Sequence, residues 1–323
     1  MWPAPQLFFS MKRTANVIKS ESQTMKMCRL RTSVLWVFAA SLLGFAGVAP
    51  AAQSHETTSS TLCVMTYNLR FASPKPPNAW PDRRPLVREC IELVNPDVLG
   101  TQEGVYTQLK DLAVDLPQFD WIGLGRDGGS KGEFMAVFYR KSRLEPVAFD
   151  HFWLSDTPRV IGSSTWGNSN RRMVTWVRFR DRITQNEVFF INTHFDHEVQ
   201  SAREKSSEAV RGFVQTLDPS LPVILVGDFN ARAGANKSYE ILTGDTFFHD
   251  TWITASQRQG EGLATFNGFK ALAKDGSRID WILTRGITKV LKSSIVDFTK
   301  EGKFPSDHLP VVAWLEIPNQ STR

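Results

Sequence analysis

The segment VILVGDFN, residues 223–230, constrains the fold more than any other stretch of this chain. Its first five residues are apolar without alternation, which is typical of a strand that is buried on both faces. The strand then ends in Asp228 and Asn230, whose side chains share one side because they are two residues apart. The segment predicts either an ordinary polar turn or functional groups mounted on a rigid strand end.

Polar side chains also follow other apolar, strand-like segments, at the point where each segment ends. Burying such groups without partners costs several kcal/mol apiece, so we expect them to meet and to satisfy one another or a metal ion. Asp280 stands inside RIDWIL and His308 just before LPVVAWL, so we expect these two to meet at one end of a sheet. The groups concerned are Asn68, Glu103, His194, Asp196, His197, Asp228, Asn230, Asp280, Asp307 and His308.

The kinds of side chain in this set indicate a hard cation. Carboxylates and amides without thiols suit Mg²⁺ or Mn²⁺. A metal of this kind beside imidazoles favours attack of water on phosphorus, in which the metal stabilises charge, a carboxylate activates the water and an imidazolium neutralises phosphoryl oxygens. The paired histidines disfavour a glycosidase that works with two carboxylates.

The segments TYN, TQE, NTHFDH, GDFN, RIDWIL and SDHLPV, in this order, resemble the endonuclease/exonuclease/phosphatase superfamily from Thr66 to Pro310. The resemblance implies an α/β (α+β) fold, a four-layer αββα sandwich. Two packed sheets, mainly antiparallel or mixed, would be flanked by helices, with the site at one edge of the sheets. Since every polar position of the pattern is filled, a family member that only binds is disfavoured.

The resemblance also implies roles for the metal and the attacking water. Glu103 is expected to be the principal metal ligand, with Asn68 beside it and Asp307 completing the network. Asp228 would orient or deprotonate the water, and Asn230 would hold the water or the phosphate.

Further roles follow for the phosphate and the leaving group. His308 would contact the scissile phosphate, and Asp280 would pair with His308 and keep it charged. His194 would donate to the phosphate or the leaving group. Substrate contacts are expected from Arg172, Asp196 and Asn267, although a solvated arginine is an alternative for Arg172.

The sequence thus predicts a metal-dependent phosphoesterase that hydrolyses phosphodiester or phosphomonoester bonds. Its substrate is left open between nucleic acid, a lipid head group as in sphingomyelinases, and a small molecule; no protein partner is indicated. Residues 1–51 hold six basic residues and one acidic residue of the whole-chain totals of 38 and 33, so 32 of each remain in 52–323. This balance disfavours a processive nuclease.

The N-terminal region is typical of a secretory signal peptide. Basic residues precede an apolar run from Val34 to Val48, and Ala49 and Ala51 form a small-residue cleavage pattern. We expect an extension and signal peptide over 1–51, cleavage near 51–52, export, and one catalytic domain over 52–323 without a transmembrane span. An uncleaved anchor is the alternative, and Met11 and Met25 are alternative start residues.

Two loops, 155–172 and 255–277, are long, polar and rich in glycine, so we expect them to be functional or disordered. Helical spacing is predicted for 86–94, 109–116, 198–217 and 237–243, and strands for most of the rest. Cys63 lies in a strand pattern and Cys90 on an apolar helix face, which favours two buried free thiols over a disulfide.

Overall fold

The computed structural model describes residues 61–320 except residue 288. The expected signal peptide and the cleavage site near 51–52 lie outside the described residues. The boundary between the leader and the catalytic domain therefore stays a prediction.

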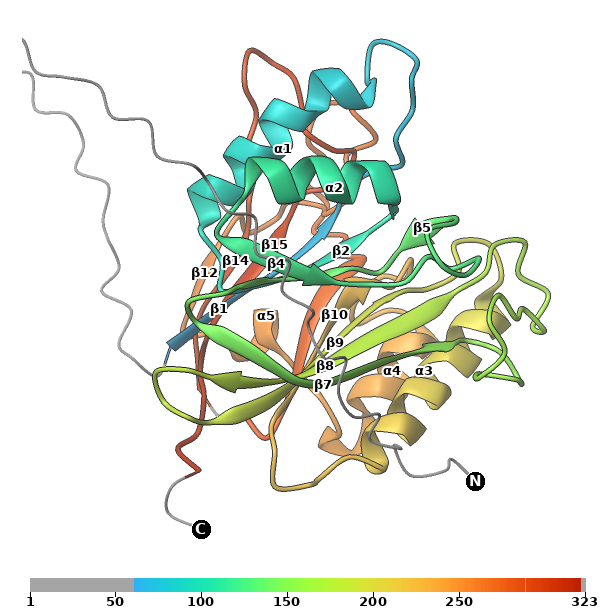
Figure 1. Ribbon diagram of the computed structural model, residues 1–323, viewed down its shortest axis with the longest axis vertical. Coiled ribbons are helices and arrows are strands. Elements are labelled where there is room, and N and C mark those ends of the chain that lie inside the picture. The colour runs from blue at the N-terminus through green and yellow to red at the C-terminus, as the bar shows by residue number, and fades with distance from the viewer. Residues whose placement is uncertain (1–60, 288, 321–323) are drawn as a thin grey trace, which may run out of the picture. The chain divides into compact units, whose positions relative to one another are not determined.

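One sheet of the protein has seven strands in the order β12–β14–β15–β1–β2–β6–β4 (Figure 1). It is mixed, because β1 pairs parallel with β2 and antiparallel with β15. The strands are β1 (Thr61–Asn68), β2 (Val98–Gln102), β4 (Phe119–Ile122), β6 (Val137–Arg140), β12 (Gln257–Gln259), β14 (Lys289–Ile295) and β15 (Val311–Glu316).

The second sheet has six strands in the order β11–β13–β10–β9–β8–β7. Its strands β9 and β10 run parallel, and its other neighbours are antiparallel. They are β7 (Leu144–Trp153), β8 (Met173–Asp181), β9 (Glu187–His194), β10 (Val223–Asp228), β11 (His249–Asp250) and β13 (Asp280–Arg285). A separate two-stranded ribbon joins β3 (Gly104–Val105) to β5 (Glu133–Phe134).

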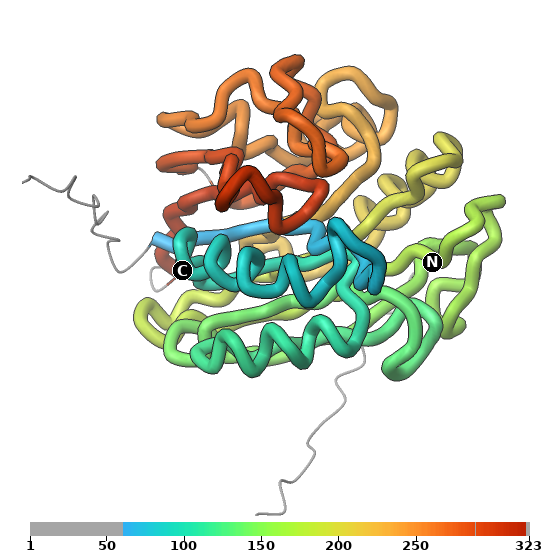
Figure 2. Tube along the Cα trace, turned by 90° about the horizontal axis from the view of Figure 1, so that it is seen from above, coloured from blue at the N-terminus to red at the C-terminus, as the bar shows by residue number. Residues whose placement is uncertain are grey.

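Helices cover the outer faces of both sheets. Figure 2 shows α1 (Trp80–Val94) and α2 (Tyr106–Asp115) side by side. Helix α1 has a proline in its first turn and ends where Asn95 adopts a left-handed conformation and donates its N–H to the Ile91 carbonyl. The remaining helices are α3 (Gln200–Gln215), α4 (Lys237–Thr243), α5 (Thr251–Thr254) and the 3₁₀ turn η1 (Gly244–Thr246).

Strand alternation divides the apolar core into layers. In β1, Val64 packs between the two sheets, whereas Met65 packs toward α1 and α2. In β10, Val226 likewise faces the layer between the sheets, and Leu225 joins the cluster that includes Phe213 of α3. Helices, sheet, sheet and helices are thus stacked, which confirms the predicted four-layer αββα sandwich.

The predicted elements agree with the structure apart from small pieces. The segment FMAVFYR is divided between β5 and β6, and the short strands β11 and β12 were not foreseen. Cys63 and Cys90 are buried free thiols, as predicted, and burial raises the pKa of both. No helix within residues 61–320 is long and apolar enough to cross a membrane.

Candidate active site

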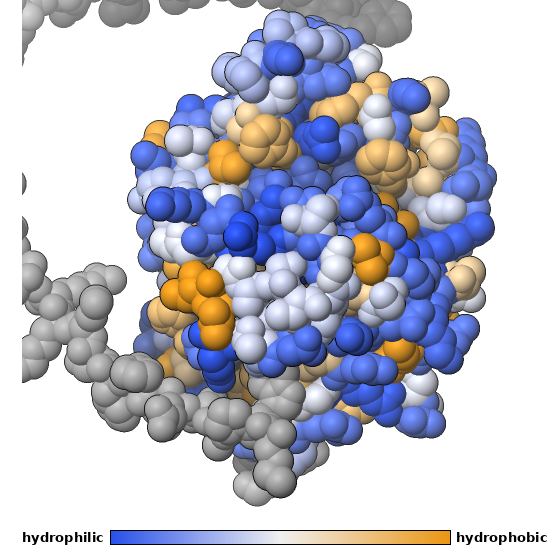
Figure 3. Space-filling model, turned by 90° about the vertical axis from the view of Figure 1, so that its right-hand side faces the viewer, coloured by the Kyte–Doolittle hydropathy of each residue, from blue (hydrophilic) through white to orange (hydrophobic). Residues whose placement is uncertain are grey.

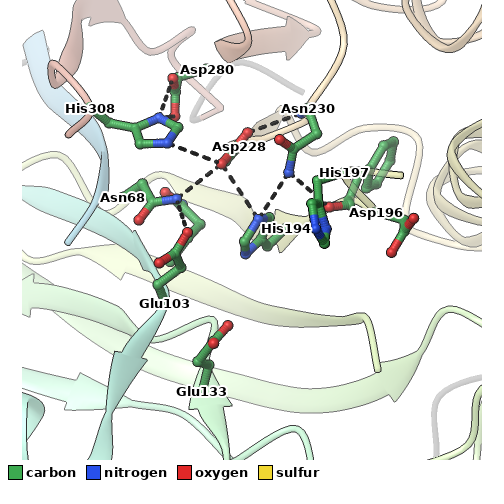
Figure 4. Close-up of polar contacts among 12 residues, drawn as sticks. Asn68, Glu103, Glu133, His194, Asp196, His197, Asp228, Asn230, Asp280 and His308 are labelled. Atoms are coloured by element: carbon green, nitrogen blue, oxygen red, sulfur yellow. Dashed lines mark hydrogen bonds and ion pairs between the residues drawn. The ribbon is translucent and has the colours of Figure 1, made fainter. Parts of the chain in front are cut away.

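Strands from both sheets end at one edge of the sandwich and carry polar side chains there. β1 and β2 run parallel in one sheet, as do β9 and β10 in the other, so each pair has its carboxyl ends together. Asn68, His194 and Asp228 are the last residues of β1, β9 and β10, and Glu103 directly follows β2. Glu103, His194, Asp228 and His308 line a pocket of about 690 Å³ (Figure 4).

The backbone at this edge adopts an uncommon conformation. Arg70, Glu103 and Asn230 have φ angles of 57°, 62° and 47°, in the left-handed region that side-chain-bearing residues seldom occupy. Such residues cost roughly 1–3 kcal/mol each and cluster at functional sites. All three line the pocket, which supports a functional reading of the strand ends.

Asn68 joins the two sheets at this edge. Its Nδ2 donates to Glu103 Oε1 at 3.0 Å and to Asp228 Oδ2 at 2.9 Å, and its Oδ1 accepts the Arg70 N–H at 2.9 Å. Burial alone raises the pKa of a carboxyl, but hydrogen bonds from Asn68 and the Phe71 N–H outweigh burial and lower the pKa of Glu103. Glu103 is therefore ionised at neutral pH, whereas metal ligation by Asn68 stays a prediction.

His308 is held between two carboxylates. Its Nδ1 lies 3.0 Å from Asp280 Oδ2, and its Nε2 lies 3.7 Å from Asp228 Oδ2. Burial alone lowers the pKa of an imidazole, but Asp280 and Asp228 outweigh burial and raise the pKa of His308 to about 10. Burial and the neighbouring Asp280 in turn raise the pKa of Asp228. His308 is consequently a fixed cation at the edge of the pocket.

The meeting of Asp280 and His308 was expected, but its place in the fold was not. Asp280 is the first residue of β13, directly opposite Asp228 in register, rather than a residue inside the strand. His308 precedes β15 in the other sheet. The pair therefore spans the two packed sheets instead of lying at one end of a single sheet.

His194 lies on the other side of Asp228. Its Nε2 is 3.0 Å from Asn230 Nδ2 and 3.4 Å from Asp228 Oδ2. Burial and then the nearby guanidiniums of Arg172 and Arg126 lower the pKa of His194 well below its usual value, so the ring is neutral. Its buried Nδ1 has no hydrogen-bond partner within the described part of the chain.

Arg172 is buried in the wall of the pocket. Its Nη2 lies 2.9 Å from His197 Nδ1, and its Nε lies 3.5 Å from Asp196 Oδ2. The fully buried Asp196 does not line the pocket; its Oδ1 accepts the N–H groups of Glu198 and Val199 at 3.0 and 2.7 Å. Asp196 holds the turn into α3 and faces Arg172, and its predicted contact with substrate stays a prediction. Substrate binding by Arg172 stays a prediction.

Asn267 also braces the structure rather than lining the pocket. Its Nδ2 donates to the Ser306 carbonyl at 3.3 Å, and its Oδ1 accepts the Phe269 N–H at 2.7 Å. Its own N–H donates to the Asp307 carbonyl at 2.7 Å. The side chain of Asn267 thus bonds to the backbone, and its predicted contact with substrate stays a prediction. Asp307 itself lines the pocket 3.5 Å from Arg70 Nε, and its role as a metal ligand stays a prediction.

Several residues of the pocket were not found from the sequence. The loops 155–172 and 255–277, predicted to be functional or disordered, contribute lining residues. No pattern marked Arg126, which lies in a charged, glycine-rich turn, or Glu133, which begins β5 after that turn. The lining residues added by the structure are Arg70, Phe71, Arg126, Glu133, Asn170, Phe266, Gly268, Phe269 and Ile279.

Arg83 of α1 is a further residue that sequence analysis missed, because its helix position looks like an exposed one. It is only 2% exposed and donates to five backbone carbonyls. Its Nη1 reaches Leu69 O at 2.7 Å and Pro305 O at 2.8 Å, and its Nη2 reaches Arg70 O at 3.1 Å. Arg83 thereby ties together the two segments that carry Arg70 and Asp307.

The donors at this edge fit a hard cation. One oxygen each of Glu103 and Asp228 and one ring nitrogen of His308 lie within 4.8 Å of one another. His308 is not a suitable ligand, because an imidazolium has no free lone pair and its Nδ1 is bound to Asp280. Glu103, Asp228 and Asp307 supply carboxylate oxygens, and burial raises the pKa of Asp228 and Asp307 although His308 and Arg70 partly offset that rise. A bound divalent cation would offset it further.

A four-layer sandwich with this carboxylate and imidazole cluster at one edge defines a class of phosphoesterases. The profile of the Endonuclease/Exonuclease/phosphatase family matches residues 65–308, and the chain belongs to that family. Members of the family are hydrolases that act on phosphoester bonds, so the protein is a phosphoesterase of this family.

Solved structures with similar sequences come from Bacteroides. An endonuclease/exonuclease/phosphatase family protein of Bacteroides thetaiotaomicron is 34% identical, with a TM-score of 0.75 over 79% of this chain and 94% of that one. A mannosyl-6-phosphatase of Bacteroides thetaiotaomicron VPI-5482 is 33% identical, with a TM-score of 0.74 over 79% and 99% of the two chains.

More distant proteins share the fold. The structure of TDP2 from D. rerio with a single-stranded DNA product is 14% identical, with a TM-score of 0.62 over 79% of this chain and 99% of that one, and shows the fold alone. An uncharacterized protein, L388, of Acanthamoeba polyphaga mimivirus is 31% identical over 161 residues, which is 47% of this chain. The match spans 59% of the length of that viral protein.

Proposed function

We propose that the protein is an exported, Mg²⁺- or Mn²⁺-dependent phosphatase that hydrolyses a phosphomonoester of a small polar molecule. The observation that carries this proposal is the charged pair His308–Asp280 beside Asp228, where His308 and Asp228 line the pocket. A cation, an acceptor for a proton of water and a carboxylate site for a metal stand within one cluster.

Each residue of the cluster has a chemical task in this proposal. The imidazolium of His308 donates to a non-bridging phosphoryl oxygen and stabilises the charge that develops there. Asp228, which accepts hydrogen bonds from Asn68 and the Asn230 N–H, orients the attacking water and takes its proton. The raised pKa of Asp228 suits a base of this kind. Neutral His194 contributes a hydrogen bond to the phosphate or the leaving group.

The metal would be held by Glu103 with support from Asn68 and Asp307. When bound, Mg²⁺ or Mn²⁺ acts as a Lewis acid that polarises a phosphoryl oxygen. The Arg70 guanidinium lies 3.7 Å from Glu103 and 3.5 Å from Asp307, and it adds positive charge at the same place.

The size of the pocket and the charge of the chain support a small monoester. A pocket of about 690 Å³ has the volume of a small-molecule site. The balanced charge of 52–323 offers no general attraction for nucleic acid. The side shown in Figure 3 is mostly hydrophilic with separate hydrophobic patches, which does not favour insertion into a bilayer. The 33% identical mannosyl-6-phosphatase supports a sugar phosphate in particular.

Export and domain limits complete the proposal. The basic residues, the apolar run Val34 to Val48 and the A-x-A pattern support a signal peptide cut near 51–52. The mature domain would then begin at 52. Sequencing the N-terminus of protein recovered outside the cytoplasm tests this part of the proposal, and an intact leader on membrane-bound protein would contradict it.

A panel of phosphate esters tests the activity of purified 52–323. The panel contains mannose 6-phosphate, phenyl phosphate, bis-p-nitrophenyl phosphate, plasmid DNA and sphingomyelin, each with Mg²⁺ and with EDTA. The proposal expects metal-dependent release of inorganic phosphate from the monoesters at far higher kcat/KM than any diester. Preferred cleavage of DNA or of sphingomyelin would instead support the nuclease or the lipid phosphodiesterase.

A further inference from the structure

Three pocket residues have not been assigned a contact with substrate above. Arg126, Glu133 and Asn170 line the same pocket as His308 and Asp228. Within the described residues, no hydrogen bond or ion pair joins them to either of those groups. Figure 4 shows Glu133 apart from the group around Asp228, with no drawn contact to it. We name these three residues the Glu133 cluster.

The Glu133 cluster is rigidly built. Arg126 Nη1 donates to Glu133 Oε2 at 2.7 Å and Nη2 donates to Oε1 at 3.2 Å, which is a bidentate pair. Arg126 Nη2 also donates to Asn170 Oδ1 at 3.2 Å. Main-chain bonds fix the same residues: the Arg126 N–H donates to the Glu133 carbonyl at 2.9 Å, and Trp153 Nε1 donates to the Arg126 carbonyl at 2.8 Å.

The position of the cluster relative to the metal site is set by the ribbon β3–β5. Gly104 directly follows Glu103 and pairs with Phe134, which directly follows Glu133. The short antiparallel pair β3–β5 therefore fixes the backbone positions of Glu103 and Glu133 relative to each other. A substrate whose phosphate lies at the metal end would extend its leaving group toward Glu133.

The chemistry of the cluster suits neutral hydroxyl groups. The carboxylate of Glu133 keeps free lone pairs that accept O–H donors, and the Arg126 guanidinium and the Asn170 amide donate to hydroxyl oxygens. Each of the two charged side chains is about one-sixth exposed or less, which leaves it reachable from the pocket. A second phosphate would be repelled by Glu133, so a polyanionic leaving group fits poorly.

The pocket also has aromatic lining residues. Phe71 and Phe266 are 44% and 48% exposed although both line the pocket. Sugars and related polyols have C–H faces that pack on aromatic rings and hydroxyl edges that need donors and acceptors. A pocket lined by both aromatic rings and these polar groups matches both features.

We propose that Arg126, Glu133 and Asn170 form a hydroxyl-binding subsite for the leaving group, so that the substrate is a phosphorylated sugar or polyol. This inference rests on the proposed phosphatase function and adds to it the residues that select the substrate. Glu133 and Asn170 are specificity residues here, because they touch the leaving group and not the reacting phosphorus.

Comparing two esters in variants of the purified full-length protein tests the subsite. Mannose 6-phosphate carries hydroxyl groups on its leaving group, and phenyl phosphate carries none. Glu133→Gln and Asn170→Ala should each lower kcat/KM for mannose 6-phosphate about 10-fold or more, as expected for a lost charge-assisted or amide hydrogen bond. Both should leave kcat/KM for phenyl phosphate within about 2-fold, since that ester makes no such bond.

Glu187→Gln is the matched control. Glu187 is held by Arg180 through bonds of 3.2 and 2.7 Å at the start of β9, whereas the pocket lies at the end of that strand. This control should leave both esters unchanged. Equal losses for both esters in folded Glu133→Gln and Asn170→Ala would show a structural role and overturn the subsite, while the phosphatase proposal would stand. Wild-type protein that hydrolyses neither ester would overturn both proposals.

Discussion

His308 and His194 occupy opposite sides of Asp228, and their protonation states are opposite too. The two side chains are almost equally buried, at 5% and 4% exposed, and their Nε2 atoms lie 3.7 and 3.4 Å from Asp228 Oδ2. The pKa of His308 is raised by its carboxylate neighbours, and the pKa of His194 is lowered by burial and by nearby guanidiniums. Burial alone therefore does not decide the charge of a histidine in this pocket.

The charged groups near each ring, other than Asp228, decide whether the histidine is protonated. Asp280 lies against Nδ1 of His308, whereas Arg172 and Arg126 add positive charge near His194. The ring of His308 is thus a cation, whereas the ring of His194 is neutral and lies near two guanidiniums.

The largest effect on activity should come from replacing Glu103, the carboxylate that we propose holds the metal. Glu103→Gln should lower kcat/KM by on the order of 10³-fold, because several kcal/mol of metal-borne charge stabilisation are lost. EDTA should abolish wild-type activity, and Mg²⁺ or Mn²⁺ should restore it. Mg²⁺ should raise the melting temperature of the wild type more than that of Glu103→Gln. Full activity in excess EDTA would rule out the metal assignment.

A smaller but selective effect on activity is expected from replacing Asp280, the partner of His308. Asp280→Asn should lower kcat by about 10²-fold, the cost of weakening one charged donor to the transition state. Asp280 raises the pKa of His308, so without it the imidazolium loses its proton at lower pH. The alkaline limb of the profile of kcat/KM against pH should therefore move toward lower pH.

Melting temperatures separate this prediction from a purely structural role of Asp280. If Asp280 only braces β13, the variant will be less stable while its surviving activity keeps the wild-type pH profile. An unshifted profile would remove Asp280 from the residues that act in catalysis.

Activity should be less sensitive to replacement of His194, the neutral histidine. His194→Gln should lower kcat/KM by about 10-fold, since a hydrogen bond from a neutral ring is weaker than one from an imidazolium. The pKa of His194 is already well below neutrality, so the alkaline limb should stay in place. An alkaline limb that moves as far as in Asp280→Asn would break the distinction between the two histidines.

The smallest predicted effect is on the pH dependence of stability and concerns His151, whose pKa is lowered mainly by burial. This half-buried ring of β7 lies 3.0 Å from Thr175 Oγ1, and burial lowers its pKa to about 4 from 6.5. The unfolded chain binds a proton there first as the pH falls, so the contribution of the neutral ring to stability is present above 6.5 and is lost toward 4. Between about pH 7 and pH 5 the free energy of unfolding should fall by about 1–2 kcal/mol more in wild type than in His151→Gln.

Denaturant titrations at the two pH values measure this difference directly. Both proteins carry the same remaining histidines, so the comparison isolates residue 151. Identical slopes of stability against pH would mean that folding does not shift the pKa of His151.

Much of the fold was predictable because short patterns of neighbouring residues specify most of its strands and helices. Apolar runs without alternation marked buried strands such as β10, and helical spacing marked α1 and α3. The ends of those runs also indicated the polar residues of the site. A buried carboxylate at a strand end costs several kcal/mol unless it has a partner, so a partner is expected. Asp228, Asn230 and His308 could be chosen for that reason before any packing was known.

Tertiary structure alone decided how those residues face one another. Asp280 and His308 belong to different sheets, so no local pattern specifies their 3.0 Å contact or the charge it gives His308. Asp196 and Asn267 resemble site residues in the sequence, but their side chains bond to the backbone.

Arg83 and Glu133 show the converse. Each reads as an ordinary surface charge, and each becomes important only because distant segments fold against it. The sequence determined which groups needed partners, since that depends on burial and residue type along one strand or helix. Which partner each group received depends on contacts between strands far apart in the chain, and only the packed sheets could settle it.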